Sequence, residues 1–119
     1  MNKVDLTEAV EMLIKFRSLR DWSKFHTPKN LSMSVSIESA ELMEHFQWKN
    51  EEETKQYLSC EKNLEKVKEE IADTISYLLL LSTDLGIDLN QTILDKIKKN
   101  EEKYPVLKCK GKSNKYNEL

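Results

Sequence analysis

Glycine and proline are scarce in this sequence, with only two of each among its 119 residues. Runs in which apolar and polar residues alternate, as they do in a strand with one buried face, are also few. Charged residues, in contrast, make up 34% of the chain. This combination argues against a β-rich fold and predicts an all-α protein, long enough for one domain with a modest core.

Cysteines and long apolar runs are scarce as well. Cys60 and Cys109 lie far apart without CxxC spacing, so we expect free thiols rather than a disulfide framework or a zinc site. The longest apolar run, residues 77–81, is far too short to span a bilayer, and the first six residues lack the apolar core of a signal peptide. We therefore expect a cytoplasmic protein without a membrane partner.

A large excess of charge of either sign is also absent, since the formal net charge is -2. Such a chain offers no broad basic surface, which argues against binding to a nucleic-acid polymer or to an anionic membrane. A small anion that is bridged to the protein by a metal ion is still compatible with this charge.

Hydrophobic periodicity predicts four long helices, at residues 6–19, 31–48, 61–85 and from Asp88 to the residue before Pro105. Residues 20–30 are expected to form a shaped loop, and residues 49–60 a solvated helix or linker without chemistry. The expected helix signals are a capping box of Asp5 with Glu8, an N-cap at Asn30, a stop at Gly86 and a capping-box-like start of Asp88 with Gln91.

Two short acidic signatures, Glu38-x-x-Glu41 and Glu70-x-x-Asp73, lie inside the second and third of these helices. Residues three apart share one face of a helix, so each signature projects two carboxylates in one direction. Two such helices side by side would bring four carboxylates together, and bare carboxylates repel one another and are costly to desolvate. Hard cations would neutralise them. Mg²⁺ is the natural candidate because it takes one or two carboxylates per ion and completes its shell with phosphate oxygens and water.

A solvated helix face is the plain alternative for such acidic residues, because Glu is common in helices. It explains Asp73 poorly, since the third helix is apolar nearly all round from Ala72 onward. A di-iron bundle is another carboxylate design, but it needs a Glu-x-x-His pair on each of two helices, and this chain has none.

The second helix carries apolar residues on two sides. One arc borders the acidic signature, and a second arc consists of Met33, Ile37 and Ala40. A helix that is apolar on two sides buries two faces, as a central or subunit-interface helix does. This pattern predicts an oligomer.

Two segments have both a structural and a functional interpretation. The aromatic residues of the first loop either plug the core or bind a ligand, because aromatic rings are most often packing residues. Residues 106–119 carry four lysines, and they form either a disordered basic tail or a clamp for phosphate.

The ordered motifs of this chain resemble those of the all-α MazG-like nucleoside triphosphate pyrophosphohydrolases, and the dCTP pyrophosphatase branch in particular. Besides the two acidic signatures, they are the residues RDWSKFH at 20–26, PKN at 28–30, FQW at 46–48 and KYNEL at 115–119. The resemblance covers nearly the whole chain. It implies a four- to five-helix bundle of residues 1–105 with a basic C-terminal arm, residues 106–119, assembled as a homodimer or homotetramer.

The resemblance also implies a hydrolase that cleaves nucleoside triphosphates between the α- and β-phosphates, giving the monophosphate and pyrophosphate. Glu38, Glu41, Glu70 and Asp73 would hold Mg²⁺, and Glu38 or Glu41 would serve as the general base. The implied substrates are dCTP or modified dNTPs, consistent with a housecleaning role in the nucleotide pool. The implied substrate-binding residues are Trp22, Phe25, His26 and Trp48 around the base, Tyr77 near the sugar or a phosphate, Lys96 and Asn100 near the phosphates, Lys115 and Tyr116 in the arm, and Asn30.

One position departs from the family pattern, because Leu13 stands where the resemblance implies a base-contacting His. A hydrogen-bonding group to the base is thereby lost, and such groups provide strong discrimination between substrates. Two rival hypotheses stay open. One is a catalytically silent helical module that binds a nucleotide or a protein, and the other is a related hydrolase acting on dUTP or phosphoribosyl-ATP.

Overall fold

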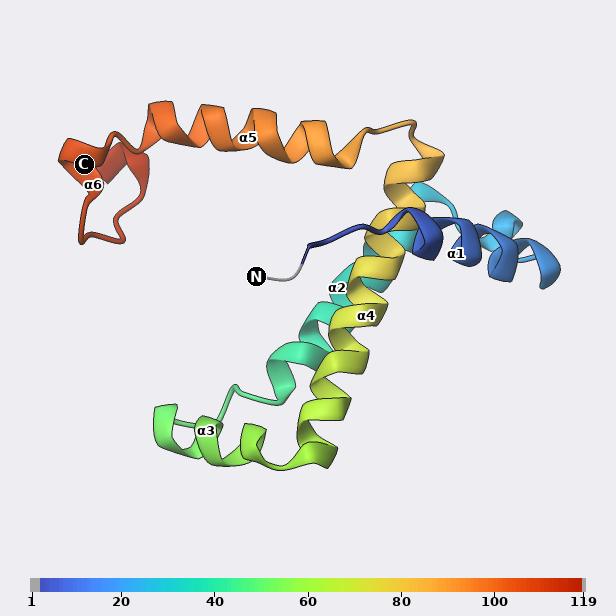
Figure 1. The fold of residues 1–119 in the computed structure, drawn as a ribbon, viewed down its shortest axis with the longest axis horizontal. Helices are drawn as coiled ribbons and strands as arrows, with labels where there is room; N and C mark the ends of the chain where they lie inside the picture. The colour runs from blue at the N-terminus through green and yellow to red at the C-terminus, as the bar shows by residue number, and fades with distance from the viewer. Residues whose placement is uncertain (1–2, 119) are drawn as a thin grey trace. The chain divides into compact units, whose positions relative to one another are not determined.

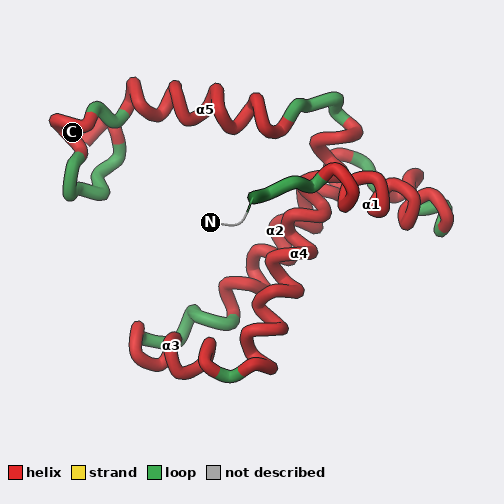
Figure 2. Tube along the Cα trace, viewed as in Figure 1, coloured by secondary structure: helices red, strands yellow, loops and turns green. Residues whose placement is uncertain are grey.

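The computed structural model describes residues 3–118, and within this range it contains six α-helices, two short 3₁₀-helices and no strand (Figure 2). The all-α prediction is therefore confirmed. The chain divides into two compact units, one ending at Leu85 and one beginning at Gly86. The first contains α1 (Thr7–Leu19), a 3₁₀-helix (Ser23–Phe25), α2 (Pro28–Glu44), α3 (Glu51–Ser59) and α4 (Glu61–Asp84). The second contains α5 (Leu89–Lys103), α6 (Val106–Cys109) and a 3₁₀-helix (Tyr116–Glu118).

The helices α2 and α4 form the centre of the first unit. They lie side by side with opposite chain directions (Figure 1), and the core between them includes Leu31, Val67, Leu79 and Leu80. Helix α1 packs against the C-terminal half of α4, and α3 packs against its N-terminal end. The antiparallel pair therefore places both acidic signatures on neighbouring helices, and α1 flanks one of them.

The starts of α1 and α2 differ from the predicted ones. Thr27 caps α2 by accepting the Asn30 N–H at 3.1 Å, and Pro28 occupies the first turn, where its missing N–H costs nothing. Asn30 is therefore not the N-cap, and its side chain donates instead to the carbonyl of Phe25 at 2.9 Å, which fastens the loop to the helix. Asp5 accepts the Thr7 N–H at 3.1 Å, but the N-cap position of α1 has no side-chain hydrogen bond.

The segment expected to be a solvated helix or linker forms α3, which begins with a capping box. Asn50 accepts the Glu53 N–H at 2.9 Å, and Glu53 accepts the Asn50 N–H at 3.2 Å. This reciprocal pair satisfies backbone donors that a helix start otherwise leaves free. Helix α2 ends at Glu44 rather than at the predicted residue 48, so Trp48 lies in the short link before α3.

The second unit begins with the two signals that the sequence predicted. Gly86 has a φ of +66°, a conformation that glycine adopts without strain, and it follows the end of α4. Asp88 then caps α5 by accepting the Gln91 N–H at 3.0 Å. After α5, the ring of Tyr104 meets the ring of Tyr116 edge-on at 6.3 Å between centroids, so the basic C-terminal segment is packed on its own unit.

Apolar surface remains uncovered on the first unit. Met33 and Ile37, on the second apolar arc of α2, are 50% and 56% exposed. This arc is therefore available on the surface of the chain, as an interface between subunits requires. No helix in residues 3–118 has both the length and the apolar character needed to cross a bilayer.

Candidate active site

The two acidic signatures lie on the adjoining helices α2 and α4, and three of their carboxylates affect the fourth, that of Glu38. Glu38 is half-buried, and its Oε2 atom is buried without a hydrogen-bond partner. Its burial, a hydrogen bond with Glu41 and the negative charges of Glu41, Asp73 and Glu70 all raise the pKa of Glu38. The charges of both acidic signatures therefore act on Glu38.

These oxygen atoms are the kind of ligand that a hard divalent cation prefers. The buried and unpartnered Oε2 of Glu38 is an unmet acceptor, and a cation would also relieve the repulsion that raises its pKa. The donor set therefore fits Mg²⁺. Within residues 3–118, however, no three acidic, histidine or cysteine side chains converge closely enough to enclose a metal ion. The metal site stays a prediction.

Glu70 is held in place by a chain of hydrogen bonds that the sequence analysis missed. Its Oε2 atom lies 2.7 Å from Nε2 of His45, and Nδ1 of the same ring pairs with the hydroxyl of Tyr57 on α3. Lys49 donates to the carbonyl of His45 and lies 4.3 Å from the centroid of the Tyr57 ring. The capping-box pattern of Asn50 and Glu53 was the signal that could have predicted α3 and thereby placed Tyr57 near the site.

A cavity of about 240 Å³ adjoins the other end of the acidic cluster. Trp22 and His26 of the first loop line it together with Tyr77 and Asp73 of α4. The rings of His26 and Tyr77 meet edge-on at 6.3 Å between centroids. Burial, followed by the charges of Glu38 and Asp73, raises the pKa of Tyr77. The cavity thus connects an aromatic wall to the carboxylates.

The aromatic loop does not plug the core. Trp22 is 42% exposed, Phe25 is 59% exposed, and His26 is half-buried beside the cavity. Burial, followed by the positive charge of Arg17, lowers the pKa of His26 and so favours its neutral form. The interpretation of this loop as a core plug is therefore disfavoured for Trp22 and Phe25.

Other predicted site residues are not among those that line this cavity. Phe25 and Asn30 do not line it, and Trp48 is 86% exposed in the link after α2. Lys96 and Asn100 lie on α5 in the second unit, where Lys115 and Tyr116 also lie, and Tyr116 packs under Lys103 at 4.9 Å. Their contribution to a site in the first unit stays a prediction.

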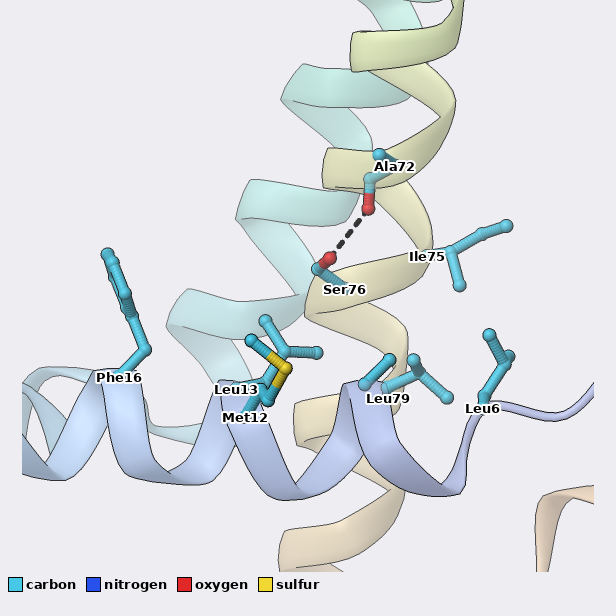
Figure 3. A pocket seen from close by; sticks show the side chains of 9 residues that line it. Leu6, Met12, Leu13, Phe16, Ala72, Ile75, Ser76 and Leu79 are labelled. Carbon is cyan, nitrogen blue, oxygen red and sulfur yellow. Dashed lines mark hydrogen bonds between the residues drawn. The ribbon is translucent and has the colours of Figure 1, made fainter.

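A second, larger cavity of about 500 Å³ lies between α1 and α4 and has an almost entirely apolar lining (Figure 3). Leu6, Met12 and Ile75 line it, and the hydroxyl of Ser76 donates to the carbonyl of Ala72 at 2.7 Å instead of facing the cavity unpaired. Leu13 lines both cavities. The residue that departs from the family pattern therefore lies at the wall of the aromatic-lined cavity and brings no polar atom to it.

Arg17 is the second group that the sequence analysis missed. It is a buried residue of α1, and its guanidinium binds Asp84 at the end of α4 through two hydrogen bonds of 2.8 Å. This ion pair raises the pKa of Arg17 and lowers that of Asp84. Arg17 lies four residues after Leu13, so the two share one face of the helix. An arginine on the same face as an apolar leucine was the sequence signal for a buried cation.

The fold and the site define a class of all-helical proteins in which two antiparallel helices each present an acidic signature beside an aromatic-lined cavity. The model of the MazG-like family matches residues 33–119. This match covers most of the chain, and the chain belongs to the MazG-like family.

Relatives and a solved structure agree with this assignment. The chain is 35% identical over 105 residues to dCTP pyrophosphatase 1 of Mus musculus and 36% identical over 105 residues to dCTP pyrophosphatase 1 of Bos taurus. These matches cover 88% of this chain but only 62% of each relative, so the chain spans about three fifths of their length. A crystal structure of a pyrophosphatase from Archaeoglobus fulgidus is 42% identical and superposes with a TM-score of 0.78, over 88% of this chain and 96% of that one.

Proposed function

We propose that this protein is a Mg²⁺-dependent nucleoside triphosphate pyrophosphohydrolase. It cleaves dNTPs between the α- and β-phosphates and releases the monophosphate and pyrophosphate. The observation that carries this proposal is the electrostatic effect of Glu41, Glu70 and Asp73 on Glu38, beside a cavity lined by aromatic rings. The names of the relatives, dCTP pyrophosphatase 1 and pyrophosphatase, support the same reaction class.

The four carboxylates would hold the metal, with Tyr57 and His45 fixing the orientation of Glu70. When bound, Mg²⁺ would supply charge neutralisation, polarisation of a phosphoryl oxygen and a template for the reacting groups. The chain's own part is to hold these oxygens in place.

Glu38 or Glu41 would act as the general base. Each lies on the first signature, where a carboxylate oxygen can accept a proton from a neighbouring water. The general base removes a proton from the attacking water, and the oxygen of this water forms a bond to one of the two phosphorus atoms of the α–β linkage. The P–O bond from that phosphorus to the bridging oxygen breaks, so that the monophosphate and pyrophosphate separate. The nucleobase of the substrate would occupy the cavity between Trp22, His26 and Tyr77.

The size of the cavity and the names of the relatives support a proposal for the substrate class. A cavity of about 240 Å³ is smaller than the pockets of roughly 300–1,000 Å³ that enclose whole drug-sized ligands, so it suits one base better than an entire nucleotide. We propose dCTP or modified dNTPs as substrates and nucleotide-pool housecleaning in the cytoplasm as the role. The exposed arc of Met33 and Ile37 supports assembly as a homodimer or homotetramer.

The test is a substrate panel of canonical and modified dNTPs, dUTP and phosphoribosyl-ATP, assayed with Mg²⁺ and with EDTA. Metal-dependent release of monophosphate and pyrophosphate from dCTP or modified dNTPs is the expected result. Preferential turnover of dUTP or phosphoribosyl-ATP would redirect the substrate assignment. A folded protein that hydrolyses no member of the panel would instead support a silent nucleotide- or protein-binding module.

A further inference from the structure

The ion pair between Arg17 and Asp84 is not explained by the acidic signatures. The guanidinium NH1 and NH2 groups of Arg17 each donate to one carboxylate oxygen of Asp84 at 2.8 Å. The Arg17 side chain is 10% exposed and the Asp84 side chain 29%. Two parallel charge-assisted bonds fix the plane of the guanidinium as well as its position. The pair therefore holds Arg17 rigidly at the end of α1.

One further donor of this guanidinium, the N–H of Nε, has no partner. Both terminal nitrogens are bonded to Asp84, but Nε of Arg17 is buried and unpaired. A buried N–H without a partner costs about 1–3 kcal/mol, so native structures rarely leave one. Arg17 also lines the cavity of about 240 Å³, together with Trp22, His26 and Tyr77. In the same cavity wall, Nδ1 of His26 is likewise buried without a partner.

We propose that Arg17, held by Asp84, donates a hydrogen bond from Nε to an acceptor on the nucleobase, a ring nitrogen or a carbonyl oxygen, and thereby determines base specificity. This inference rests on the proposed function, because it assumes that the aromatic-lined cavity receives the base of a nucleotide. It assigns Asp84 as a positioning residue that acts through Arg17.

The surroundings of Arg17 favour a base over a phosphate. Its charge is already balanced by Asp84, and the cavity around it includes the apolar side chains of Leu13 and Leu80. A phosphate would lose much of its hydration in this wall without gaining a free cation, whereas a heterocyclic base brings acceptors and an apolar ring. The phosphates are better accommodated at the Asp73 end of the cavity, next to the carboxylates.

Arg17 also replaces a function that Leu13 cannot supply. The two residues lie four apart on one face of α1, and both line the cavity. Leu13 contributes no hydrogen-bonding atom, so the polar contact from α1 to the base comes from the next turn of the same helix. Base selection in this chain therefore depends on Arg17 of α1, which belongs neither to the first acidic signature nor to the aromatic loop.

The test compares dCTP with 2-deoxyribose 5-triphosphate, which has the same sugar and phosphates but no base. The measured quantity is the ratio of kcat/KM for the two compounds, together with the ratio of their affinities by calorimetry. The main variant is Arg17→Lys, because lysine keeps a cation opposite Asp84 but has no donor at the Nε position. Asp84→Asn is the second variant, and Lys15→Met, an exposed cation on the same helix, is the matched control.

In Arg17→Lys we expect the dCTP-to-abasic ratio to fall roughly ten- to a hundredfold, as the loss of one hydrogen bond from a charged donor predicts. Asp84→Asn should give a smaller fall, and Lys15→Met should keep the wild-type ratio. An unchanged ratio in a folded Arg17→Lys protein would overturn the inference. If the wild type hydrolyses neither compound, the proposed function fails, and the affinity ratio alone then decides the role of Arg17.

Discussion

Removal of the His45 imidazole should weaken metal binding more than it weakens the fold. In His45→Ala, one oxygen of Glu70 and the hydroxyl of Tyr57 lose their shared partner. The side chains of His45 and Glu70 are 14% and 21% exposed, so water replaces part of the lost bonding, and we expect a loss of about 1–2 kcal/mol in the free energy of unfolding. Loss of a group that orients a metal ligand should lower the affinity for Mg²⁺ by roughly 10- to 100-fold.

The assay combines urea unfolding with calorimetric titration of Mg²⁺ into the same preparation. Tyr57→Phe is the matched control, because it removes only the outer hydrogen bond to the ring of His45. It should cost about 0.5–1.5 kcal/mol in stability and change the affinity for Mg²⁺ less than His45→Ala does. A His45→Ala protein that binds Mg²⁺ as tightly as the wild type would refute the reasoning, since the contact would then serve the fold alone.

Four further predictions test separate parts of the structure. Glu38→Gln should stabilise the metal-free protein at neutral pH. Because the pKa of Glu38 is raised in the folded state, its contribution to the free energy of unfolding is fully present below the unfolded-state pKa and is lost as pH rises through the folded-state pKa. Urea unfolding at acidic and neutral pH should therefore show a smaller loss of stability with rising pH in this variant than in the wild type. An identical loss of stability in both proteins would exclude Glu38 as its origin. Leu31→Ala should cost about 2–5 kcal/mol in urea unfolding because Leu31 is only 1% exposed, and a loss below about 1 kcal/mol would contradict its place in the core. The double substitution Met33→Glu with Ile37→Glu should lower the molar mass measured by light scattering, whereas a mass equal to that of the wild type would place the subunit interface elsewhere. Trp48→Ala should raise KM with little change in Tm because Trp48 is 86% exposed, and a large drop in Tm with unchanged KM would show that it has a structural role instead.

The helical fold was largely predictable because the relevant signals are local. The 3.6-residue periodicity predicted the long helices, and Gly86 and Asp88 mark the turn between α4 and α5 as expected. The start of α2 was misplaced because Asn30 was chosen as the cap, although Thr27 followed by Pro28 is the stronger start signal. Boundaries are decided by competition between neighbouring caps, and spacing alone does not resolve that competition.

The site was predictable only where its residues share a helix. The pairs of carboxylates follow from spacings of three, but the partners that hold the site together come from distant segments. Arg17 and Asp84 are 67 residues apart, and His45 and Glu70 are 25 apart. Such contacts depend on how α1, α2 and α4 pack, and a single sequence shows the apolar faces of these helices without showing their pairing.

The most direct test of the central claim is identification of the products that this protein forms from dCTP, in the wild type, in Glu41→Gln and in Glu44→Gln. Glu44 is an exposed carboxylate on α2 outside both signatures, so it is the matched control for the loss of one charge. We predict Mg²⁺-dependent formation of dCMP and pyrophosphate by the wild type and by Glu44→Gln, and loss of this turnover in a folded Glu41→Gln protein. Full activity of Glu41→Gln, or formation of dCDP and phosphate, would contradict the account.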